Sequence, residues 1–260
     1  MDGFKVKKII IGLLLLVDLL LLAMLVRDRA AAAAIRREAR HGVESAFSDS
    51  GIALPTDIPW DTELTSCSLN RSRDTENSMA SAVIGRCTVQ DLGGNILFYR
   101  SERGEAQFRG TGEFQIMPFT GQVAAGNDPV DTAVSILRKM GIRTDARSAR
   151  VTPGEQTTTI TLTCMFMGES VYNCTVDFLF SSENLLMIDG CRPMEYSDKR
   201  SAETLDAATM LLRYLAEVRA SGLICSEIRS VEPGWMMTSS ASGEGSMTPF
   251  WKIETDVGRS

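Results

Sequence analysis

Histidine is nearly absent from this 260-residue chain, where His41 is its single occurrence. A Ser-His-Asp or Cys-His mechanism would have to take its base from that one position, which lies among arginines in an expected helix. The six cysteines include no C-x-x-C pair, so the local spacing of structural zinc sites is missing as well. We therefore expect a protein that is not an enzyme and that has no metal site and no cofactor.

Clustered positive charge is scarce beyond the N-terminal region. The net charge is -6, and the basic residues after position 40 are dispersed, so no patch favours DNA or RNA as a partner. The stretch SSASGEGS from Ser239 lacks the lysine and the following helix of a phosphate-binding P-loop, and we interpret it as a hairpin loop. Five carboxylates in expected hairpins are interpreted as solvated charges rather than an acid–base pair: Glu102, Glu105, Glu113, Asp177 and Asp189.

One long apolar run is present, IIIGLLLLVDLLLLAMLV from Ile9 to Val26. Eighteen residues with one charge are about the minimum for crossing a bilayer core. We expect residues 1–8 to form a cytoplasmic tail and 9–26 a single transmembrane helix of the cell membrane. Long following domains are translocated largely regardless of charge, so the C-terminal domains are expected outside the cytoplasm. The competing interpretation is a cleaved signal peptide.

Asp18 lies in the middle of this run. An ionisable group at that depth costs several kcal/mol and usually has a partner or a functional role. We predict that Asp18 binds a second membrane helix of a partner protein. The alternative is that the strongly apolar helix tolerates Asp18 in a protonated or hydrated state.

The helical pattern continues beyond the apolar run. Apolar residues recur at three- and four-residue spacing through Ile35, Val43 and Phe47, and Gly51 and Pro55 end the pattern. Residues 27–50 are therefore expected to form a helical stalk that packs on another helix.

The remainder is expected to be α+β, in two related units at 51–143 and 144–260. In the first, strands are expected near 64–69 and at NILFYRS, EAQFRGT and FQIMPF, with a short helix at 76–84. A second helix is expected after Asp128 as N-cap and Pro129 at the first helical position, closed by Gly141. Each unit is predicted to be a curved antiparallel sheet with one packed helix.

The second unit repeats this order. Its strands are expected at TTTITLTCMF, YNCTVDFLF and NLLMIDG, followed by a helix over 203–220 and two further strands, LICSEIRSV and TPFWKIETD. Either the sheet ends soon after the last strand or the sequence is truncated there.

The cysteines lie at 67, 87, 164, 174, 191 and 225, an even number that permits disulfides in an oxidising compartment. Small buried thiols in strands are the alternative. A tight turn around Gly168 and Glu169 would place Cys164 and Cys174 on neighbouring strands, so this pair is the candidate disulfide.

The order of parts supports a family resemblance. A lysine-led anchor with one polar residue is followed by an arginine-rich stalk ending in SGIALP, two α+β units, and the strings VEPGWMMTSS and TPFWKIETD. Over nearly its whole length the chain resembles the YycI/YycH family, most closely a clostridial-type YycI. It departs from that family in its six cysteines and in ending after the WKIETD strand, where the family commonly continues.

The resemblance implies a bitopic protein of Gram-positive bacteria, with one transmembrane helix and extracytoplasmic domains in the cell envelope. Members engage a sensor histidine kinase of a cell-wall two-component system, so this chain would be a regulator of such a kinase. A paralogous regulator would be its heterodimer partner. The same order of strands and helices also permits a PepSY-like ligand-binding or structural envelope protein, which a deep apolar pocket would favour.

Overall fold

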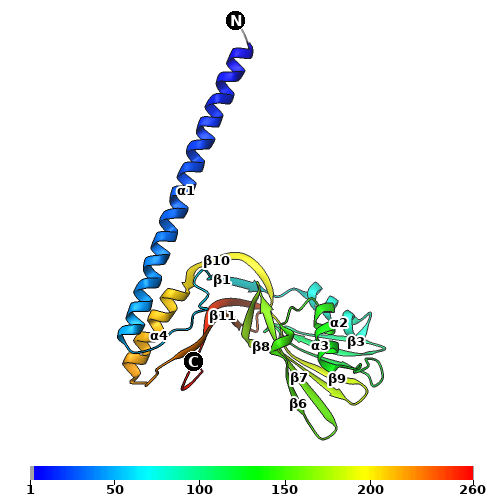
Figure 1. Cartoon of the computed structure of the whole chain (residues 1–260). Coiled ribbons are helices and arrows are strands. Elements are labelled where there is room, and N and C mark those ends of the chain that lie inside the picture. The colour runs from blue at the N-terminus through cyan, green and yellow to red at the C-terminus, as the bar shows by residue number, and fades with distance from the viewer. Residues whose placement is uncertain (1–2, 260) are drawn as a thin grey trace. The chain divides into compact units, whose positions relative to one another are not determined.

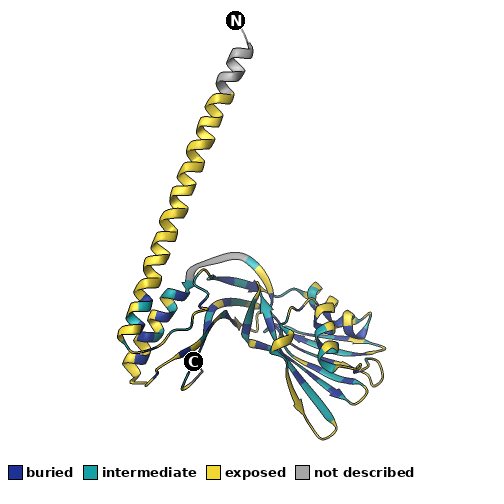
Figure 2. Ribbon diagram, in the orientation of Figure 1, coloured by how far each residue is buried: buried dark blue, intermediate teal, exposed yellow. Residues whose placement is uncertain are grey.

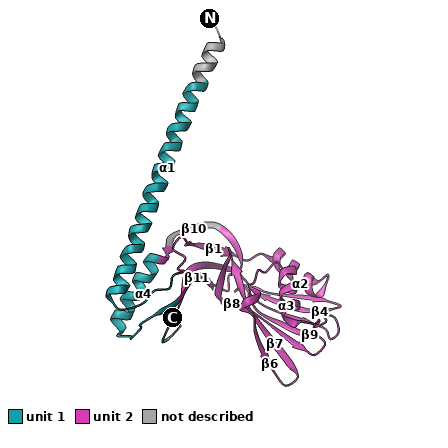
Figure 3. Ribbon diagram, viewed as in Figure 1, with its two compact units in different colours: residues 1–56, 208–229, 255–257 teal, residues 57–207, 230–254, 258–260 magenta. Residues whose placement is uncertain are grey.

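The computed structural model describes the backbone of residues 3–259 and the side chains of residues 11–197 and 205–257. Within that range the fold is mixed α/β, with four α-helices and one curled sheet of 13 strands (Figure 1). The chain divides into two units (Figure 3). Unit 1 combines residues 1–56, 208–229 and 255–257, and unit 2 combines residues 57–207, 230–254 and 258–260.

Unit 1 is built from two helices. α1 runs without interruption over Gly3–Asp49, so the expected membrane segment and stalk form one helix. α4 (Ala207–Ser221) lies beside its last turns (Figure 1), and the Arg219 guanidinium donates a hydrogen bond of 2.6 Å to Ser50 Oγ. Val43 and Phe47 of α1 are fully buried. The residues expected to form the stalk are thus helical, and the last turns of α1 lie beside α4.

Unit 2 contains two shorter helices, α2 (Arg73–Ile84) and α3 (Pro129–Lys139). Asp128 caps α3 as predicted, because its Oδ1 accepts a hydrogen bond of 2.8 Å from the backbone N–H of Val130, and Pro129 opens the helix. Ser72 caps α2 in the same way, accepting from the N–H of Thr75 at 3.3 Å. A 3-10 turn, η1 (Ala146–Ser148), follows α3.

The strands of unit 2 form a single path in the order β10-β1-β12-β11-β8-β9-β5-β4-β3-β2, with β6, β7 and β13 attached beside it. Their bounds are β1 (Glu63–Asn70), β2 (Thr88–Asp91), β3 (Ile96–Ser101), β4 (Gly104–Arg109), β5 (Glu113–Pro118), β6 (Arg150–Pro153), β7 (Thr157–Phe166), β8 (Glu169–Ser181), β9 (Leu185–Cys191), β10 (Glu195–Asp206), β11 (Ile228–Ser239), β12 (Glu244–Thr255) and β13 (Gly258–Arg259). The short strands β2 to β5 form the expected hairpins, with Gly93 and Gly94 in the first turn.

The two sheets expected from the sequence are one sheet in the structure. β5 from the first half pairs with β9 from the second, from Glu113 opposite Cys191 to Ile116 opposite Ile188. β1 likewise pairs with both β10 and β12. The expected boundary at 143/144 therefore does not coincide with the two units. Local patterns set where a strand forms, but these partners lie far away along the chain.

The helix expected over 203–220 begins later, at Ala207, because residues 203–206 complete β10. The segment EYSDKRSAETLD has six charged residues among its twelve and gives no strand pattern. Its antiparallel pairing with β1, from Glu63 opposite Asp206 to Asn70 opposite Glu195, provides the backbone hydrogen bonds instead. Strands β11 and β12 are also longer than expected and leave only residues 240–243 as their loop.

The core of unit 2 lies between its helices and one face of the sheet. Side chains alternate along β4 and β5, so Phe108 and Phe114 point into the core and stack with ring centroids 5.6 Å apart. Tyr99 meets Phe108 edge to face at 5.4 Å. α2 and α3 cover this face with Met79 and Leu137, both essentially unexposed. The opposite face of these strands carries polar side chains and is left open.

Candidate functional site

The first half of α1 presents an apolar surface that nothing in the described structure covers. Every large apolar side chain from Ile11 to Val26 is between 43% and 64% exposed. The helix is accordingly drawn as exposed over this whole length in Figure 2. Asp18 is exposed in the middle of this surface. The structure therefore places Asp18 as the one charged side chain between Ile11 and Val26.

Among the residues that the structure describes, no helix has the length and apolar character that crossing a membrane requires. The expected membrane segment Ile9–Val26 begins with two residues that lie outside the described side chains.

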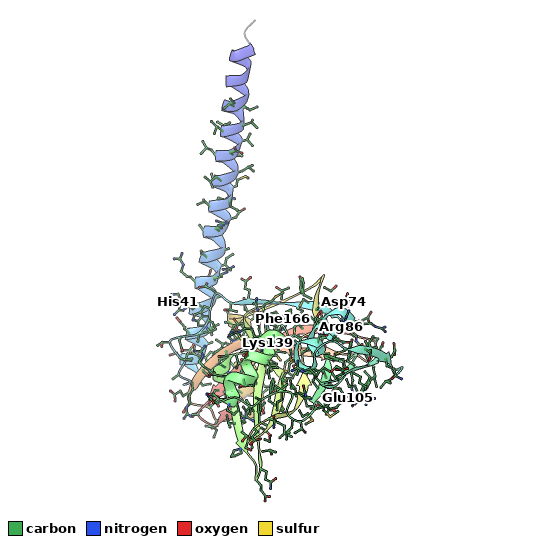
Figure 4. The ribbon with its side chains drawn as sticks, turned by 90° about the vertical axis from the view of Figure 1, so that its right-hand side faces the viewer. His41, Asp74, Arg86, Glu105, Lys139 and Phe166 are labelled. Atoms are coloured by element: carbon green, nitrogen blue, oxygen red, sulfur yellow. The ribbon has the colours of Figure 1, made fainter. Side chains whose placement is uncertain are left out.

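His41 lies on the outer surface of α1 (Figure 4), and its side chain is 86% exposed. Its Nδ1 is 3.5 Å from a carboxylate oxygen of Glu44, one turn along the same helix. Among the side chains that the structure describes, none form a group of three or more that could hold a metal ion.

The open face of the unit 2 sheet contains a hollow of about 380 Å³. Strands β4, β5, β8 and β9 contribute its lining. The side chains are mostly amides, carboxylates and hydroxyls, in contrast with the deep apolar pocket that would mark a site for an apolar ligand. The lining residues are Gln107, Arg109, Glu113, Phe114, Gln115, Asn173, Thr175, Asp177, Asp189, Gly190 and Cys191.

Two carboxylates in the lining of this hollow lie on neighbouring strands. Asp177 on β8 and Asp189 on β9 are directly opposite each other in the ladder. Thr161 Oγ1 donates a hydrogen bond of 2.6 Å to Asp177, and Gln115 Nε2 donates one of 3.3 Å to Asp189. Like charges in this position destabilise a sheet. These side chains form a polar surface on which the amide and hydroxyl groups can donate and accept hydrogen bonds and the carboxylates can accept them.

Three of the five carboxylates noted in the sequence, Glu113, Asp177 and Asp189, are thus brought together in one hollow. The other two are not among them. Glu105 pairs with Arg100 on β3 at 3.1 Å, and Glu102 lines a separate surface depression.

A buried cluster of three charged residues lies in the core of unit 2. The Arg71 guanidinium donates hydrogen bonds of 2.8 Å to each carboxylate oxygen of Glu76, and Arg192 Nη2 donates one of 3.1 Å to Glu76 Oε1. Arg71 Nη1 also donates to the backbone carbonyl of Asn95 at 2.5 Å. These bonds connect the end of β1, the start of α2 and the connection after β9. Burial, and then the neighbouring Glu76 carboxylate, raise the pKa of Tyr99 to about 12.

The six cysteines are all free thiols. Cys164 and Cys174 lie on the paired strands β7 and β8 as expected, fully buried and hydrogen-bonded to each other. A disulfide between them stays a prediction. The structure adds Cys191 of β9, whose thiol is hydrogen-bonded to that of Cys174.

Sequence reasoning missed two of these groupings. Cys191 belongs to the thiol group only because β9 pairs with β8, which no local pattern revealed. The buried role of Glu76 and Arg192 was equally hidden, because charged side chains are ordinarily expected at the surface. One available sign was the position of Glu76 on the apolar side of α2, three residues before Met79.

No protein-family model matches this chain. No curated protein matches it either. Among solved structures, the chain is similar to the crystal structure of an uncharacterized protein from Eubacterium rectale, with 10% sequence identity and a TM-score of 0.47 over 79% of this chain and 82% of that chain. Membership of the YycI/YycH family therefore stays a prediction.

Proposed function

We propose that this chain is a membrane-anchored, non-enzymatic regulator that acts on a sensor histidine kinase through its N-terminal helix and through the extracytoplasmic residues that follow the membrane segment. The observation that supports the proposal most directly is the uncovered apolar surface of α1 between Ile11 and Val26. Thirteen large apolar side chains remain more than 40% exposed there, although Val43 and Phe47 on the same helix are fully buried.

An uncovered surface of this kind needs an apolar environment. Monomeric soluble proteins rarely expose continuous apolar patches beyond a few hundred Å². A lipid bilayer would surround the helix from all sides, which matches side chains that are exposed all round rather than along one stripe. At 1.5 Å per residue, residues 9–26 would span about 27 Å, close to the thickness of a hydrocarbon core of about 30 Å.

Asp18 supports the regulatory part of the proposal. A carboxylate at the centre of a bilayer is costly unless it contacts a polar group, and a helix of a partner protein can supply one. A ligand or partner shifts a conformational equilibrium only through contacts that differ between the two states. A hydrogen bond from Asp18 to one arrangement of the kinase helices would provide such a difference.

The choice of a histidine kinase as the partner rests on the resemblance to the YycI/YycH family. The continuous α1 is compatible with it, since a helix that passes without a break from the expected membrane segment into the stalk can couple the two. A paralogous regulator as heterodimer partner belongs to the same proposal.

The experiment is affinity purification of the tagged full-length protein from host membranes solubilised in mild detergent. We expect the wild-type protein to recover a sensor histidine kinase, identified by mass spectrometry. The Asp18→Leu variant should remain in the membrane fraction and lose the kinase. Leu20→Val is the matched control, because residue 20 points about 200° away from residue 18 around the helix and the change keeps an apolar side chain.

Protease treatment of intact spheroplasts tests the orientation. Digestion from outside is expected for the residues that follow the expected membrane segment, from position 27 onward, whereas their protection would place them in the cytoplasm. Equal recovery of the kinase by wild type and Asp18→Leu would contradict the proposed contact, and recovery of no kinase by either would contradict the regulator.

A second candidate function is a PepSY-like ligand-binding or structural protein of the cell envelope. The hollow on the open sheet face is not the deep apolar pocket expected for this class, but its amide and carboxylate side chains suit a hydrophilic ligand. Soluble peptidoglycan fragments are the probe. A rise in Tm on their addition that is lost in a Gln107→Ala and Gln115→Ala double variant would support this function, and an unchanged Tm at millimolar fragment would argue against it.

A further inference from the structure

Three thiols gather on three neighbouring strands of unit 2. Cys164 comes from β7, Cys174 from β8 and Cys191 from β9, and β8 is hydrogen-bonded to both other strands. The thiol of Cys174 is hydrogen-bonded to those of Cys164 and Cys191. Cys164 Sγ in turn donates to the carbonyl oxygen of Cys191 at 3.4 Å. Cys174 is therefore the central member of the group.

The three thiols differ in access to solvent. Cys164 and Cys174 are fully buried in the core. Cys191 is half-buried and lines the polar hollow on the open face. A reagent that arrives from solvent therefore meets Cys191 first.

The thiols also differ in acidity. The hydrogen bond from Cys174 lowers the pKa of Cys191, and the neighbouring Arg192 guanidinium lowers it further, against the effects of burial and of Glu113. Hydrogen bonds with Cys164 and Cys191, together with burial, raise the pKa of Cys174. The thiolate is the nucleophilic form of cysteine. Cys191 thus combines the better access with the more acidic thiol.

The buried charge cluster also favours a thiolate at Cys191. Arg71, Glu76 and Arg192 together carry a net charge of +1 inside the core, and Arg192 Nε has no hydrogen-bond partner among the described residues. A negative charge next to Arg192 is consequently favourable. A thiolate on Cys191, the residue adjacent to Arg192, would supply it.

We propose that Cys191 and Cys174 form a thiol–disulfide exchange site, in which Cys191 is the attacking thiol and Cys174 the resolving thiol. The Cys191 thiolate attacks one sulfur of an external low-molecular-weight or protein disulfide, breaks its S–S bond and releases the first thiol. Cys174 then gives up its proton, and its sulfur attacks Cys191 Sγ in the mixed disulfide. The second external thiol leaves as the Cys174–Cys191 bond forms.

These reaction steps are balanced, because one external disulfide is reduced to two thiols while two protein thiols are oxidised to one disulfide. Cys164 stays reduced, held by its hydrogen bond to the Cys191 carbonyl. The site does not depend on the proposed regulatory function, and it assigns to Cys174 a partner other than Cys164.

The test uses the purified full-length protein in detergent, incubated with oxidised glutathione, quenched in acid, alkylated and mapped by mass spectrometry without reduction. We expect a Cys174–Cys191 disulfide, with the other four cysteines alkylated. In Cys174→Ser, glutathione should remain attached to Cys191. In Cys191→Ser, oxidation of Cys174 should be at least about tenfold slower, the factor that one pKa unit of thiolate formation represents.

The matched control is Cys87→Ser. Cys87 is also half-buried, but burial raises the pKa of its thiol, and its Sγ donates to the carbonyl of Gly85 at 2.9 Å. Its substitution should leave the oxidation rate within about twofold of wild type, well inside the tenfold effect expected at Cys191. A Cys164–Cys174 disulfide with Cys191 free, or glutathione on Cys87 before Cys191, would overturn the proposal.

A measurement on the unsubstituted protein tests the same assignment without relying on the folding of any variant. At pH 7, iodoacetamide should alkylate Cys191 about tenfold faster than Cys87, and the rate at Cys191 should reach its plateau at the lower pH. Equal rates and coincident pH profiles for the two thiols would reject the assignment of Cys191 as the attacking thiol.

Discussion

Glu76 binds the guanidinium of Arg71 through both of its carboxylate oxygens, at 2.8 Å each, inside the core of unit 2. The same carboxylate also accepts from Arg192 at 3.1 Å. The single negative charge of Glu76 therefore compensates two buried positive charges. Removing one partner of a buried ion pair is far more costly than the pair itself is stabilising, because the remaining charge is left without compensation.

Glu76→Gln is accordingly expected to lower the free energy of unfolding by about 3–5 kcal/mol. The change keeps the shape of the side chain and removes its charge. Urea denaturation at pH 7 measures the loss, and Glu102→Gln at an exposed turn position is the control, with an expected change below about 0.5 kcal/mol. A loss below about 1 kcal/mol in Glu76→Gln would show that the core tolerates the charges of Arg71 and Arg192 without a compensating carboxylate.

The pKa of Tyr99, raised to about 12, predicts an effect of alkaline pH on stability. The folded protein keeps the Tyr99 proton to higher pH than the unfolded chain, in which tyrosine ionises near pH 10. The contribution of Tyr99 is complete below about pH 10 and is lost as the pH rises towards 12, by up to about 1.4 kcal/mol per pH unit.

Tyr99→Phe should therefore reduce the loss of stability between pH 9 and pH 11 relative to wild type. Burial raises the pKa of Tyr214 to about 12 as well, so part of the alkaline loss remains in the variant. Unfolding free energies of the two proteins at pH 7, 9 and 11 provide the measurement. Parallel curves would mean that Tyr99 ionises alike in the folded and unfolded states.

The sequence predicted the local elements of this fold more fully than their arrangement. Asp128 and Pro129 marked the start of α3 because capping depends on adjacent residues. The charged segment of β10 gave no strand pattern, because its strand conformation depends on pairing with β1 more than a hundred residues earlier. The joining of the two expected sheets through β5 and β9 is a consequence of the same long-range pairing.

The candidate sites likewise divide into those that local sequence reveals and those that depend on long-range strand pairing. Asp18 was recognisable from sequence, since a single carboxylate in an apolar run stands out without any tertiary information. Cys164 and Cys174 were recognisable as neighbours through the turn at Gly168. Cys191 joins them only through strand pairing, and Asp177 and Asp189 share a hollow for the same reason. Positions that depend on two distant strands require the tertiary structure.

The cross-strand pair of Asp177 and Asp189 predicts a stabilising substitution. Two carboxylates directly opposite each other repel, and each pair of this kind is worth roughly 0.2–1 kcal/mol. Asp189→Asn removes the repulsion and keeps an oxygen that can accept the hydrogen bond from Gln115 Nε2. We expect an increase of about 0.5 kcal/mol in the free energy of unfolding at pH 7 and low salt.

The gain from Asp189→Asn should shrink in 0.5 M NaCl, because salt screens the repulsion that the substitution removes. Glu155→Gln removes the same charge from an exposed turn and serves as the control. A destabilised Asp189→Asn variant would instead indicate that the charge of Asp189 is needed in the hollow.

Gly190 allows β9 to approach β8 closely next to Cys191. A Cβ atom at this position would lie 2.7 Å from the Cα of Val176 and closer still to the carbonyl oxygen of Thr175. Both neighbours are backbone atoms of a central strand and cannot move aside easily. Gly190→Ala should therefore lower the free energy of unfolding by about 1–3 kcal/mol, the usual effect of overpacking.

Gly42→Ala is the matched control, because a Cβ at that exposed position of α1 meets nothing within 4 Å. This change should stabilise the helix by about 0.5–1 kcal/mol, since alanine loses less conformational freedom than glycine. Gly190→Ala should also slow formation of the Cys174–Cys191 disulfide with oxidised glutathione, because it moves β9 away from β8. If Gly190→Ala folds with wild-type stability and oxidises at the wild-type rate, the close approach of the two strands does not position the thiols.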